Sequence, residues 1–370
     1  MQSSKKIFLD LNIVSFLIII TSCIIIALGN INMLGISQKL NQKEIFEKYS
    51  IVSIAVVLSL IIGFLIGRRA ERTMLTFGII AFIISFILLV LVEFTGVHKY
   101  GSRRWIYIGG MSIHPTELIK VPIIMITSYY LAYKDLLWKI LVSIPVIIVP
   151  SILVLKHPDY GSAGSILFVF LVSVFVSEIP IRFIILIFII IGLSAPLVWE
   201  YGLKDYHRER IIGLLEQEER AMEIAYQTVQ SKIAIASGGL YGAGIGKGEH
   251  GSGQWIPNLH TDFALASISE DIGFVGSTIT IILFMILITL LALKSIASEV
   301  KIAKTTCILT VSLIFFHAFV NIGMVSGILP VIGIPLTFIS YAGTHNVVAG
   351  FLVGLCSGIP ERKPTPIKPL

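Results

Sequence analysis

The sequence predicts an all-α polytopic membrane protein: a bundle of about ten transmembrane helices with a large extracytoplasmic loop that contains an amphipathic helix. Of the 370 residues, 55% are apolar and 14% are charged, whereas soluble domains carry about 25% charged residues. Mean hydropathy is +0.91, and apolar stretches recur along the chain. One helical bundle can account for its whole length, so we expect a single membrane domain over residues 1–370.

Ten stretches have the apolar content of a membrane span, which needs about 20 residues. The first follows Lys5 and Lys6 and resembles a signal peptide, but no small-residue cleavage site comes after it, so we expect a retained helix. A Pro/Gly-rich connection separates the last two spans. The expected spans cover residues 12–30, 50–67, 75–95, 117–133, 137–155, 163–179, 181–199, 272–293, 305–326 and 336–357.

The basic residues predict the orientation of the bundle. Ten spans place both termini on one side, and the positive-inside rule assigns the cytoplasm to that side once segment 200–260, which the rule weights less, is set aside. Lys99, Arg103 and Arg104 then lie outside, where their positive charge suggests binding of an anion. Because topology explains most of the net charge of +6, we expect no nucleic-acid partner.

Residues 200–260 are too long for a simple connection. Apolar residues recur near helical spacing from Ile211 to Ala236, while charged residues such as Arg208 occupy other positions. This pattern predicts an amphipathic helix that lies in the membrane interface or covers the bundle, and a role in substrate binding is an equally good interpretation. Glycines alternate around Lys247 but fail the Walker pattern, so we interpret them as a flexible turn.

Two polar pairs lie one helical turn apart inside expected spans. Glu117 and Lys120 share a helix face, and both are costly to leave unpaired in lipid. A buried structural ion pair and the binding of an anionic headgroup are equally good interpretations of this pair. For His317 and Asn321 we favour hydrogen bonds between helices.

Asp262 is the candidate functional carboxylate. It follows His260 and Thr261 and precedes an apolar span, where membrane and water meet. A carboxylate in such a place is usually paired, hydrated or functional, because its desolvation is costly. Burial raises the pKa of carboxyl groups in general, which suits a general base. His250, His260 and Asp262 lack a compact metal-binding spacing, so we expect no metal site by motif.

Seven motifs, taken in order, resemble the SEDS family (shape, elongation, division and sporulation), and its RodA branch more closely than its division counterpart FtsW. The likeness runs over nearly the whole chain. The runs Gln230–Ile235 and Asn321–Pro330 are similar to RodA rather than to FtsW. The remaining motifs are Arg104-Trp105, Pro115–Lys120, His157–Ser162, Ser237–Leu240 and His260–Phe263.

The resemblance implies a peptidoglycan glycosyltransferase of the bacterial cytoplasmic (inner) membrane, with cytoplasmic termini, that polymerises lipid II on the outer face during cell elongation and rod-shape maintenance. It implies a class B penicillin-binding protein as transpeptidase partner, together with other membrane proteins of the elongation complex. The family's essential aspartate lies in its His-Thr-Asp-Phe motif and corresponds to Asp262. We hypothesise that Asp262 is the general base that takes the proton of the acceptor hydroxyl.

The leaving group in this reaction is a lipid pyrophosphate, which needs cations rather than a general acid. The candidates to bind it are Arg104, Lys120, Arg208 and Arg210, with a divalent cation (Mg²⁺ or Mn²⁺) as a possible addition. The full set of expected substrate-binding residues is Arg104, Glu117, Lys120, Asp159, Arg208, Arg210, Lys232, His260 and Thr261.

The chain departs from the family pattern at two single positions and in one short run. Asn258 stands where the family usually has glutamate, and Thr337 where it usually has proline. The run Ser340–His345 replaces a Ser-Tyr-Gly-Gly-Ser pattern. If the family's glutamate tunes or assists the aspartate, its replacement by Asn258 is expected to alter the pH dependence of the activity.

Two other functions are compatible with the chain. A lipid II flippase or transporter would suit ten spans with charges inside the membrane, but no internal repeat is visible. A non-catalytic scaffold for a class B penicillin-binding protein is the other, and the intact Asp262 argues against it.

Overall fold

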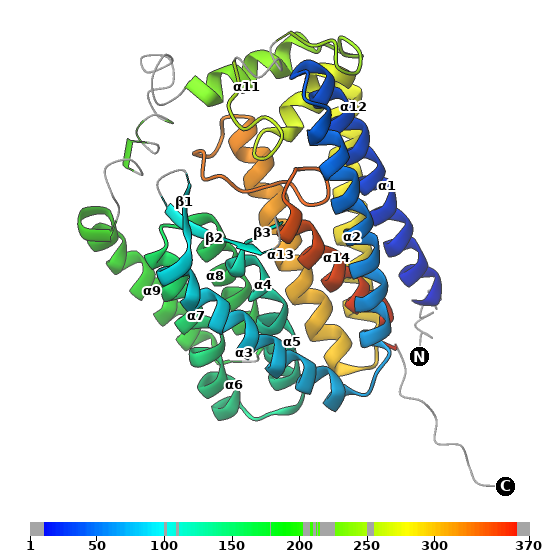
Figure 1. Ribbon diagram of the computed structural model, residues 1–370. Helices are drawn as coiled ribbons and strands as arrows, with labels where there is room; N and C mark the ends of the chain where they lie inside the picture. Colours follow the sequence, from blue (N-terminus) through cyan, green and yellow to red (C-terminus); the bar gives the residue numbers. More distant parts are fainter. Residues whose placement is uncertain are drawn as a thin grey trace, which may run out of the picture.

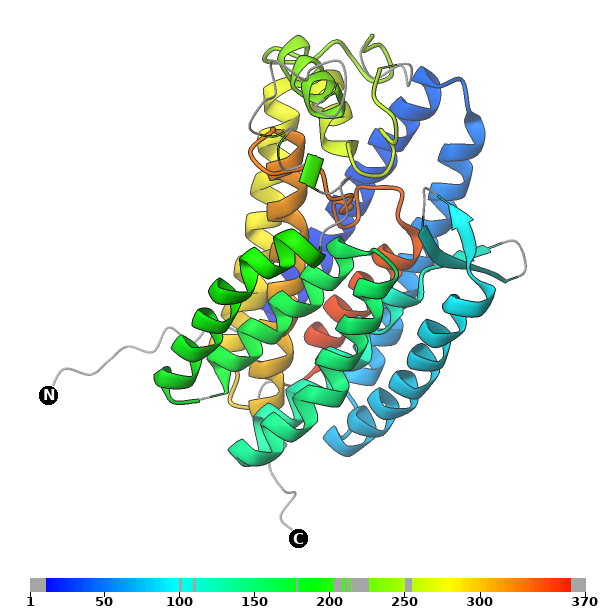
Figure 2. The same ribbon diagram turned by 90° about the vertical axis from the view of Figure 1, so that its left-hand side faces the viewer.

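The computed structural model describes residues 11–99, 102–108, 111–177, 179–202, 208–209, 212, 214, 226–249 and 255–360. These residues form a helical bundle in which long helices run roughly side by side (Figure 1). In both views, α11 lies across one end of the bundle, and we call this the loop end (Figures 1 and 2). The first described residue of α1 and the last of α14 lie toward the opposite end.

Every predicted span has a helical counterpart, so the predicted fold class is confirmed. Within the described residues, six helices are long and apolar enough to cross a membrane, and α8 and α9 are shorter apolar helices. The helices are α1 (Leu11–Lys39), α2 (Lys43–Gly67), α3 (Glu71–Thr95), α4 (Pro115–Leu118), α5 (Lys120–Tyr133), α6 (Leu136–Ser143), α7 (Val149–Lys156), α8 (Tyr160–Val176), α9 (Ile181–Leu197), α11 (Tyr226–Ser237), α12 (Ala264–Ala297), α13 (Lys301–Val325) and α14 (Gly343–Gly358), with π-helical turns η1 (Ile144–Ile148) and η2 (Val198–Gly202).

A small antiparallel sheet is the one exception to helical structure among the described elements. Its strands are β1 (Val97–Lys99), β2 (Ser102–Ile108) and β3 (Met111–Ile113), in the order β1-β2-β3. Val97 pairs with Trp105, and Ile106 pairs with Ile113. The sheet therefore joins α3 to α4 and carries Arg104 and Trp105 on its central strand.

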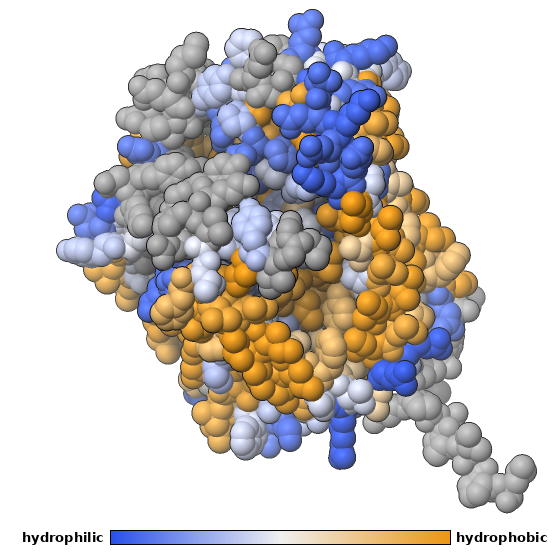
Figure 3. Space-filling view, viewed as in Figure 1, coloured by the Kyte–Doolittle hydropathy of each residue, from blue (hydrophilic) through white to orange (hydrophobic). Residues whose placement is uncertain are grey.

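The surface has the pattern expected of a membrane protein. A broad apolar band crosses the middle of the visible face, and polar residues gather above and below this band (Figure 3). Large apolar side chains such as Ile54, Phe188 and Ile282 are exposed on the helices. Exposed apolar side chains of this extent need lipid rather than water around them, so the chain is a multi-pass membrane protein.

The predicted amphipathic helix is described only in its second part. Residues 203–207, 210, 211, 213 and 215–225 lie outside the described residues. The remainder, α11, buries Ser231 and Ala234 and leaves Lys232 exposed. The Ser231 hydroxyl donates to the carbonyl of Val325 at 2.8 Å, so α11 packs on the end of α13.

The eighth predicted span begins earlier than expected. It was expected at residue 272, but α12 starts at Ala264 and has non-helical backbone at Gly273 (φ 75°, ψ −162°). Hydropathy excludes Glu270 and Asp271 from a span, yet both are buried because Lys39 pairs with them at 2.8 and 2.7 Å. At the break, the N–H groups of residues 243 and 244 donate to the carbonyls of residues 270 and 271, at 2.9 and 3.0 Å.

The tenth predicted span begins later than expected. Residues 336–342 are irregular, and the helix α14 begins only at Gly343. Phe338 has a φ of 66°, a left-handed conformation that rarely suits an aromatic residue. It is held there by Tyr49, whose hydroxyl donates to the Phe338 carbonyl at 2.5 Å, and by Asn346, which accepts from its N–H at 2.8 Å.

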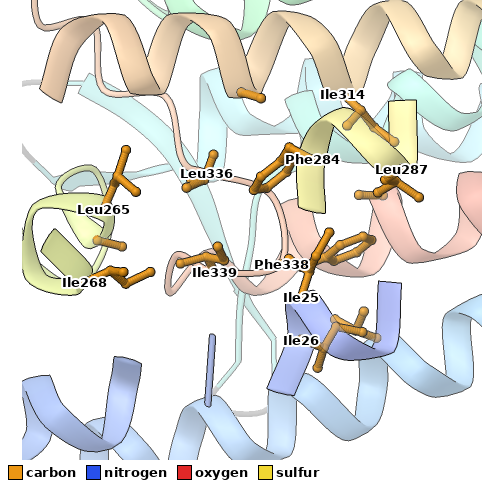
Figure 4. Close-up of a cluster of buried hydrophobic side chains, with 14 of the residues drawn as sticks. Ile25, Ile26, Leu265, Ile268, Phe284, Leu287, Ile314, Leu336, Phe338 and Ile339 are labelled. Atoms are coloured by element: carbon orange, nitrogen blue, oxygen red, sulfur yellow. The ribbon is translucent and has the colours of Figure 1, made fainter. Parts of the chain in front are cut away.

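We call residues 331–342 the inserted segment, because its backbone passes into the core of the bundle. The side chains of Leu336, Phe338 and Ile339 lie among apolar side chains of α1, α12 and α13 (Figure 4). Thr337 and Ser340 are fully buried. Irregular backbone is tolerated at membrane depth only when protein surrounds it, and the core supplies those surroundings.

Close backbone contact joins α2 to α14. Small residues recur four apart on both helices, a pattern typical of tightly packed membrane helices. A Cβ added to Gly354 would lie 2.0 Å from the Leu60 carbonyl oxygen, and one added to Gly63 would lie 2.1 Å from the Phe351 carbonyl oxygen. The obstacles are backbone atoms, which cannot rotate away as a side chain can.

We expect Gly354→Val to destabilise the protein by at least about 1–3 kcal/mol, the range typical of overpacking a core. Thermal unfolding in detergent, followed by size-exclusion chromatography, measures the effect. Gly192→Val is the matched control, because nothing lies within 4 Å of a Cβ at Gly192 on α9. Equal unfolding temperatures for the two variants would contradict the close approach of α2 and α14.

Candidate active site

Asp262 lies in a tight turn over residues 255–263, immediately before α12. The backbone turns at Asn258, which has a φ of 58°, and the Asn258 carbonyl accepts from the N–H groups of Thr261 and Asp262 at 3.0 and 3.1 Å. Leu259 and Phe263 are buried, whereas His260, Thr261 and Asp262 are partly exposed. The apolar residues thus anchor the turn while its polar residues keep access to solvent.

The inserted segment forms one wall beside Asp262. The N–H of Tyr341 donates to the His260 carbonyl at 2.8 Å, and the two rings lie 5.8 Å apart. A Cβ at Gly333 would lie 3.4 Å from the Asp262 carboxylate oxygen Oδ2, and Gly333 has a φ of 77°. A residue with no side chain and free access to left-handed backbone therefore stands next to the carboxylate.

Asn321 joins this turn to the inserted segment. Its Nδ2 donates to the carbonyls of Asp262 at 2.9 Å and of Ile334 at 2.7 Å. The prediction that Asn321 bonds between helices is therefore wrong, because its partners lie in two loops. His317, one turn earlier, does reach other helices: its Nε2 lies 3.4 Å from Nζ of Lys120, and its ring lies 4.2 Å from that of His345.

Glu117 and Lys120 form the predicted ion pair, and both are buried. Glu117 Oε1 lies 2.6 Å from Nζ of Lys120, and Glu117 Oε2 lies 2.8 Å from Nδ1 of His345. The other ring nitrogen of His345 lies 3.0 Å from the Thr337 hydroxyl. Two of the family departures, Thr337 and His345, therefore contact each other and tie the inserted segment to Glu117.

Arg104 and Asp159 form a second polar cluster. Arg104 Nη1 lies 3.5 Å from Asp159 Oδ1, and the same guanidinium donates to the carbonyls of His157, at 3.2 Å, and Pro158. The Thr116 hydroxyl donates to Asp159 at 3.1 Å. Arg104 therefore ties β2 to the turn between α7 and α8, although anion binding was the expected role of this residue.

Burial and charge act in opposite directions on the pKa values of this cluster. Burial works to raise the pKa of Asp159, but His114 and Arg104 outweigh it and hold that pKa below its ordinary value of 3.8. Burial lowers the pKa of both His114 and His157 below the ordinary value of 6.5. At neutral pH the cluster thus contains an ionised carboxylate, a guanidinium and two neutral imidazoles.

Ser162 connects the two clusters. Its N–H donates to Asp159 Oδ1 at 3.3 Å, and its hydroxyl donates to Glu117 Oε1 at 3.3 Å. Contacts therefore run from Arg104 through Asp159 and Glu117 to the inserted segment, and from there to the Asp262 turn. Neither Ser162 nor Tyr341 was predicted to take part in the site, because the contacts of Ser162 with Glu117 and of Tyr341 with His260 join distant parts of the chain.

The remaining predicted residues lie elsewhere. Arg208 donates from Nε to the Trp199 carbonyl at 2.9 Å and from Nη2 to the Glu200 carbonyl. Lys232 is exposed on α11. Arg210 lies outside the described residues, and so does His250. Within the described parts of the chain, no three His, Cys, Asp or Glu side chains are placed to hold a metal ion.

Comparisons with known proteins agree on one family. A sequence model of the FtsW/RodA/SpoVE family, described as "Cell cycle protein", matches residues 9–363. The peptidoglycan glycosyltransferase MrdB of Escherichia coli K12 is 33% identical over 276 residues, covering 73% of this chain and 74% of MrdB. The probable peptidoglycan glycosyltransferase FtsW of Geobacter metallireducens is 31% identical over 287 residues, covering 76% of each chain.

Solved structures share the fold. A chain from a study of how a peptidoglycan synthase complex coordinates polymerization and crosslinking matches with a TM-score of 0.77 at 24% identity, covering 92% of this chain and 96% of that one. The rod shape determining protein RodA of Thermus thermophilus matches with a TM-score of 0.65 at 22% identity, covering 94% and 97%.

Substitutions at Asn258 test the geometry of the turn before α12. Because left-handed backbone suits glycine and asparagine, we expect Asn258→Gly to unfold close to the wild-type temperature. Asn258→Val should cost about 1–2 kcal/mol, since a β-branched residue is strained at positive φ. Thermal unfolding in detergent ranks the variants by unfolding temperature, and we expect Asn258→Ala to lie between Asn258→Gly and Asn258→Val. An unfolding temperature for Asn258→Val at or above that of Asn258→Gly would contradict the left-handed turn.

Proposed function

The chain belongs to the FtsW/RodA/SpoVE family, and from this premise we propose that it polymerises lipid II into glycan strands during cell elongation and rod-shape maintenance. Family membership makes the chain a peptidoglycan glycosyltransferase, the activity by which its curated relatives are named. One observation carries the finer proposal. Asp262 is a partly exposed carboxylate on a turn whose backbone is fixed by the protein core.

The proposed reaction needs a single base. Asp262 takes the proton from the 4-hydroxyl of the acceptor sugar as that oxygen attacks the anomeric carbon of the donor. The bond between the anomeric carbon and the pyrophosphate breaks, and undecaprenyl pyrophosphate leaves with the bonding electrons. Because this leaving group is already stable as an anion, no general acid has to protonate it. One carboxylate therefore suffices, whereas a glycosidase uses two.

Cations must neutralise the charge that develops on the pyrophosphate. Arg104 and Lys120 contact Asp159 and Glu117 inside the protein, and Arg208 donates to two backbone carbonyls. Arg104, Lys120, Arg208 and Arg210 are the proposed pyrophosphate ligands, with Mg²⁺ or Mn²⁺ as an additional candidate. His260 and Thr261 directly precede the base and are proposed to contact the acceptor sugar.

The orientation and partners follow from the same proposal. The chain is proposed to lie in the bacterial inner membrane as a single domain, with both termini cytoplasmic and segment 200–260 outside. The position of the described ends opposite the loop end supports this orientation (Figure 1). A class B penicillin-binding protein and other elongation proteins are the proposed partners, supported by the structural similarity to a chain from a study of a synthase complex.

Asp262→Asn should abolish strand formation while leaving the fold intact, because the amide keeps the shape of the side chain but cannot accept the proton. Glycan strands made from fluorescent lipid II are measured with purified wild type and variant, each with the penicillin-binding partner added. Unfolding temperature and lipid II binding serve as controls for folding. Strand formation by a well-folded Asp262→Asn variant would exclude Asp262 as the base. Bound lipid II without strands from either protein would favour transport or scaffolding.

A further inference from the structure

Two buried asparagines, from helices on different sides of the Asp262 turn, contact the backbone where α12 begins. Asn321 on α13 donates from Nδ2 to the Asp262 carbonyl at 2.9 Å. Asn32 on α1 donates from Nδ2 to the Ala264 carbonyl at 3.1 Å. The two accepting carbonyls stand on either side of Phe263, whose side chain is fully buried.

Both asparagines are costly to bury. Asn32 is 4% exposed and Asn321 is not exposed at all. In each of them, the side-chain oxygen Oδ1 has no hydrogen-bond partner among the described residues. A buried amide oxygen without a partner carries a desolvation cost, while the N–H groups of each asparagine satisfy backbone carbonyls that leucine would leave without that donor. Each asparagine is therefore kept at a cost, and what its amide supplies is a fixed contact to the backbone of this region.

The contacts fix the direction of the Asp262 side chain. The Asp262 carbonyl stands just before the first carbonyl of the helical ladder, since Ala266 N–H bonds to Phe263 at 2.9 Å. The two peptide planes next to Asp262 are held through its N–H, which donates to the Asn258 carbonyl at 3.1 Å, and through its carbonyl, which accepts from Asn321. Asn32 holds the Ala264 carbonyl in the first turn of α12 and so fixes the helix start that follows Asp262. The direction of the Asp262 Cα–Cβ bond is then set as well. Asn321 also holds the Ile334 carbonyl at 2.7 Å, which keeps neighbouring Gly333 beside the carboxylate.

We propose that Asn32 and Asn321 are positioning residues that hold the Asp262 carboxylate in the orientation needed for proton transfer. This inference rests on the proposed role of Asp262. Neither asparagine touches the substrate; each acts through the backbone of the turn. Small errors in the placement of a catalytic group lower the rate steeply, about a hundredfold for a displacement near 1 Å.

The test replaces each asparagine with leucine, which has a similar shape but no amide. Asn30→Leu is the matched control. Asn30 lies two residues before Asn32 on α1, and its amide bonds to Ile26 and Ser53 rather than to the turn. Turnover and KM for lipid II are measured for each variant per folded molecule, together with hydrogen exchange of the backbone amides of residues 258–264.

We expect kcat to fall about tenfold or more in Asn32→Leu and Asn321→Leu, with KM changed by less than about threefold, because orientation rather than binding is lost. Amide exchange of the turn should accelerate in both variants. Unfolding temperatures should fall because backbone carbonyls lose a donor, so rates are compared per folded molecule. Asn30→Leu should match wild type in all three measurements. If Asn321→Leu fails to fold, Asn321→Asp keeps the shape and leaves at most one hydrogen to donate.

Other results would overturn the inference. Normal kcat in both leucine variants, or a rise in KM alone, would show that the asparagines do not position the base, while strand formation that still requires Asp262 would leave the proposed function standing. No strands from the wild type would instead overturn the proposed function. In that case unchanged amide exchange in the leucine variants would also show that the asparagines do not hold the turn.

Discussion

Backbone that leaves helical geometry inside a membrane protein must find its hydrogen-bond partners within the protein, because lipid offers none. The break at Gly273 meets this requirement with the glycine-rich loop over residues 239–244. The N–H groups of residues 243 and 244 donate to the carbonyls of residues 270 and 271, and the carbonyls of residues 239 and 240 accept from the N–H groups of residues 274 and 275. The inserted segment meets it with side chains from α2, α13 and α14, among them Tyr49 and Asn346. Tyr49 and Asn346 are buried, and all of these contacts are specific, so the irregular backbone is held in one conformation. The inserted segment in turn holds the Asp262 turn, because the Tyr341 N–H donates to the His260 carbonyl and Asn321 binds the carbonyls of both Asp262 and Ile334.

Features that depend on neighbouring residues could be predicted from the sequence. The ten spans follow from local hydropathy, the Glu117–Lys120 pair from helical spacing, and the position of Asp262 from the apolar run after it. Contacts between distant residues could not be predicted. The bond between His345 and Glu117 joins residues 228 positions apart, and that between Asn32 and Ala264 joins residues 232 apart. Hydropathy indicates which residues are buried, but it does not identify the partners of a buried polar group.

The same limit explains why the charge of Arg104 did not predict its contacts within the protein. A basic residue on a connection outside the membrane suggested an anion site, yet the guanidinium is directed at Asp159 and two backbone carbonyls. Its contacts pass through Ser162 and Glu117 to His345 and Thr337, so the polar residues of the bundle form a continuous support for the inserted segment. Rigid support of this kind suits a reaction in which a single carboxylate must meet a sugar hydroxyl in the right geometry.

The central claim is that Asp262 removes the proton of the acceptor hydroxyl as the new glycosidic bond forms. The most direct test is the solvent deuterium isotope effect on single-turnover strand extension, measured with the partner bound and lipid II saturating. If a proton is transferred to Asp262 in the transition state, extension is slower in D₂O than in H₂O. Equal rates in the two solvents, with chemistry confirmed as the slow step, would contradict general-base catalysis by Asp262.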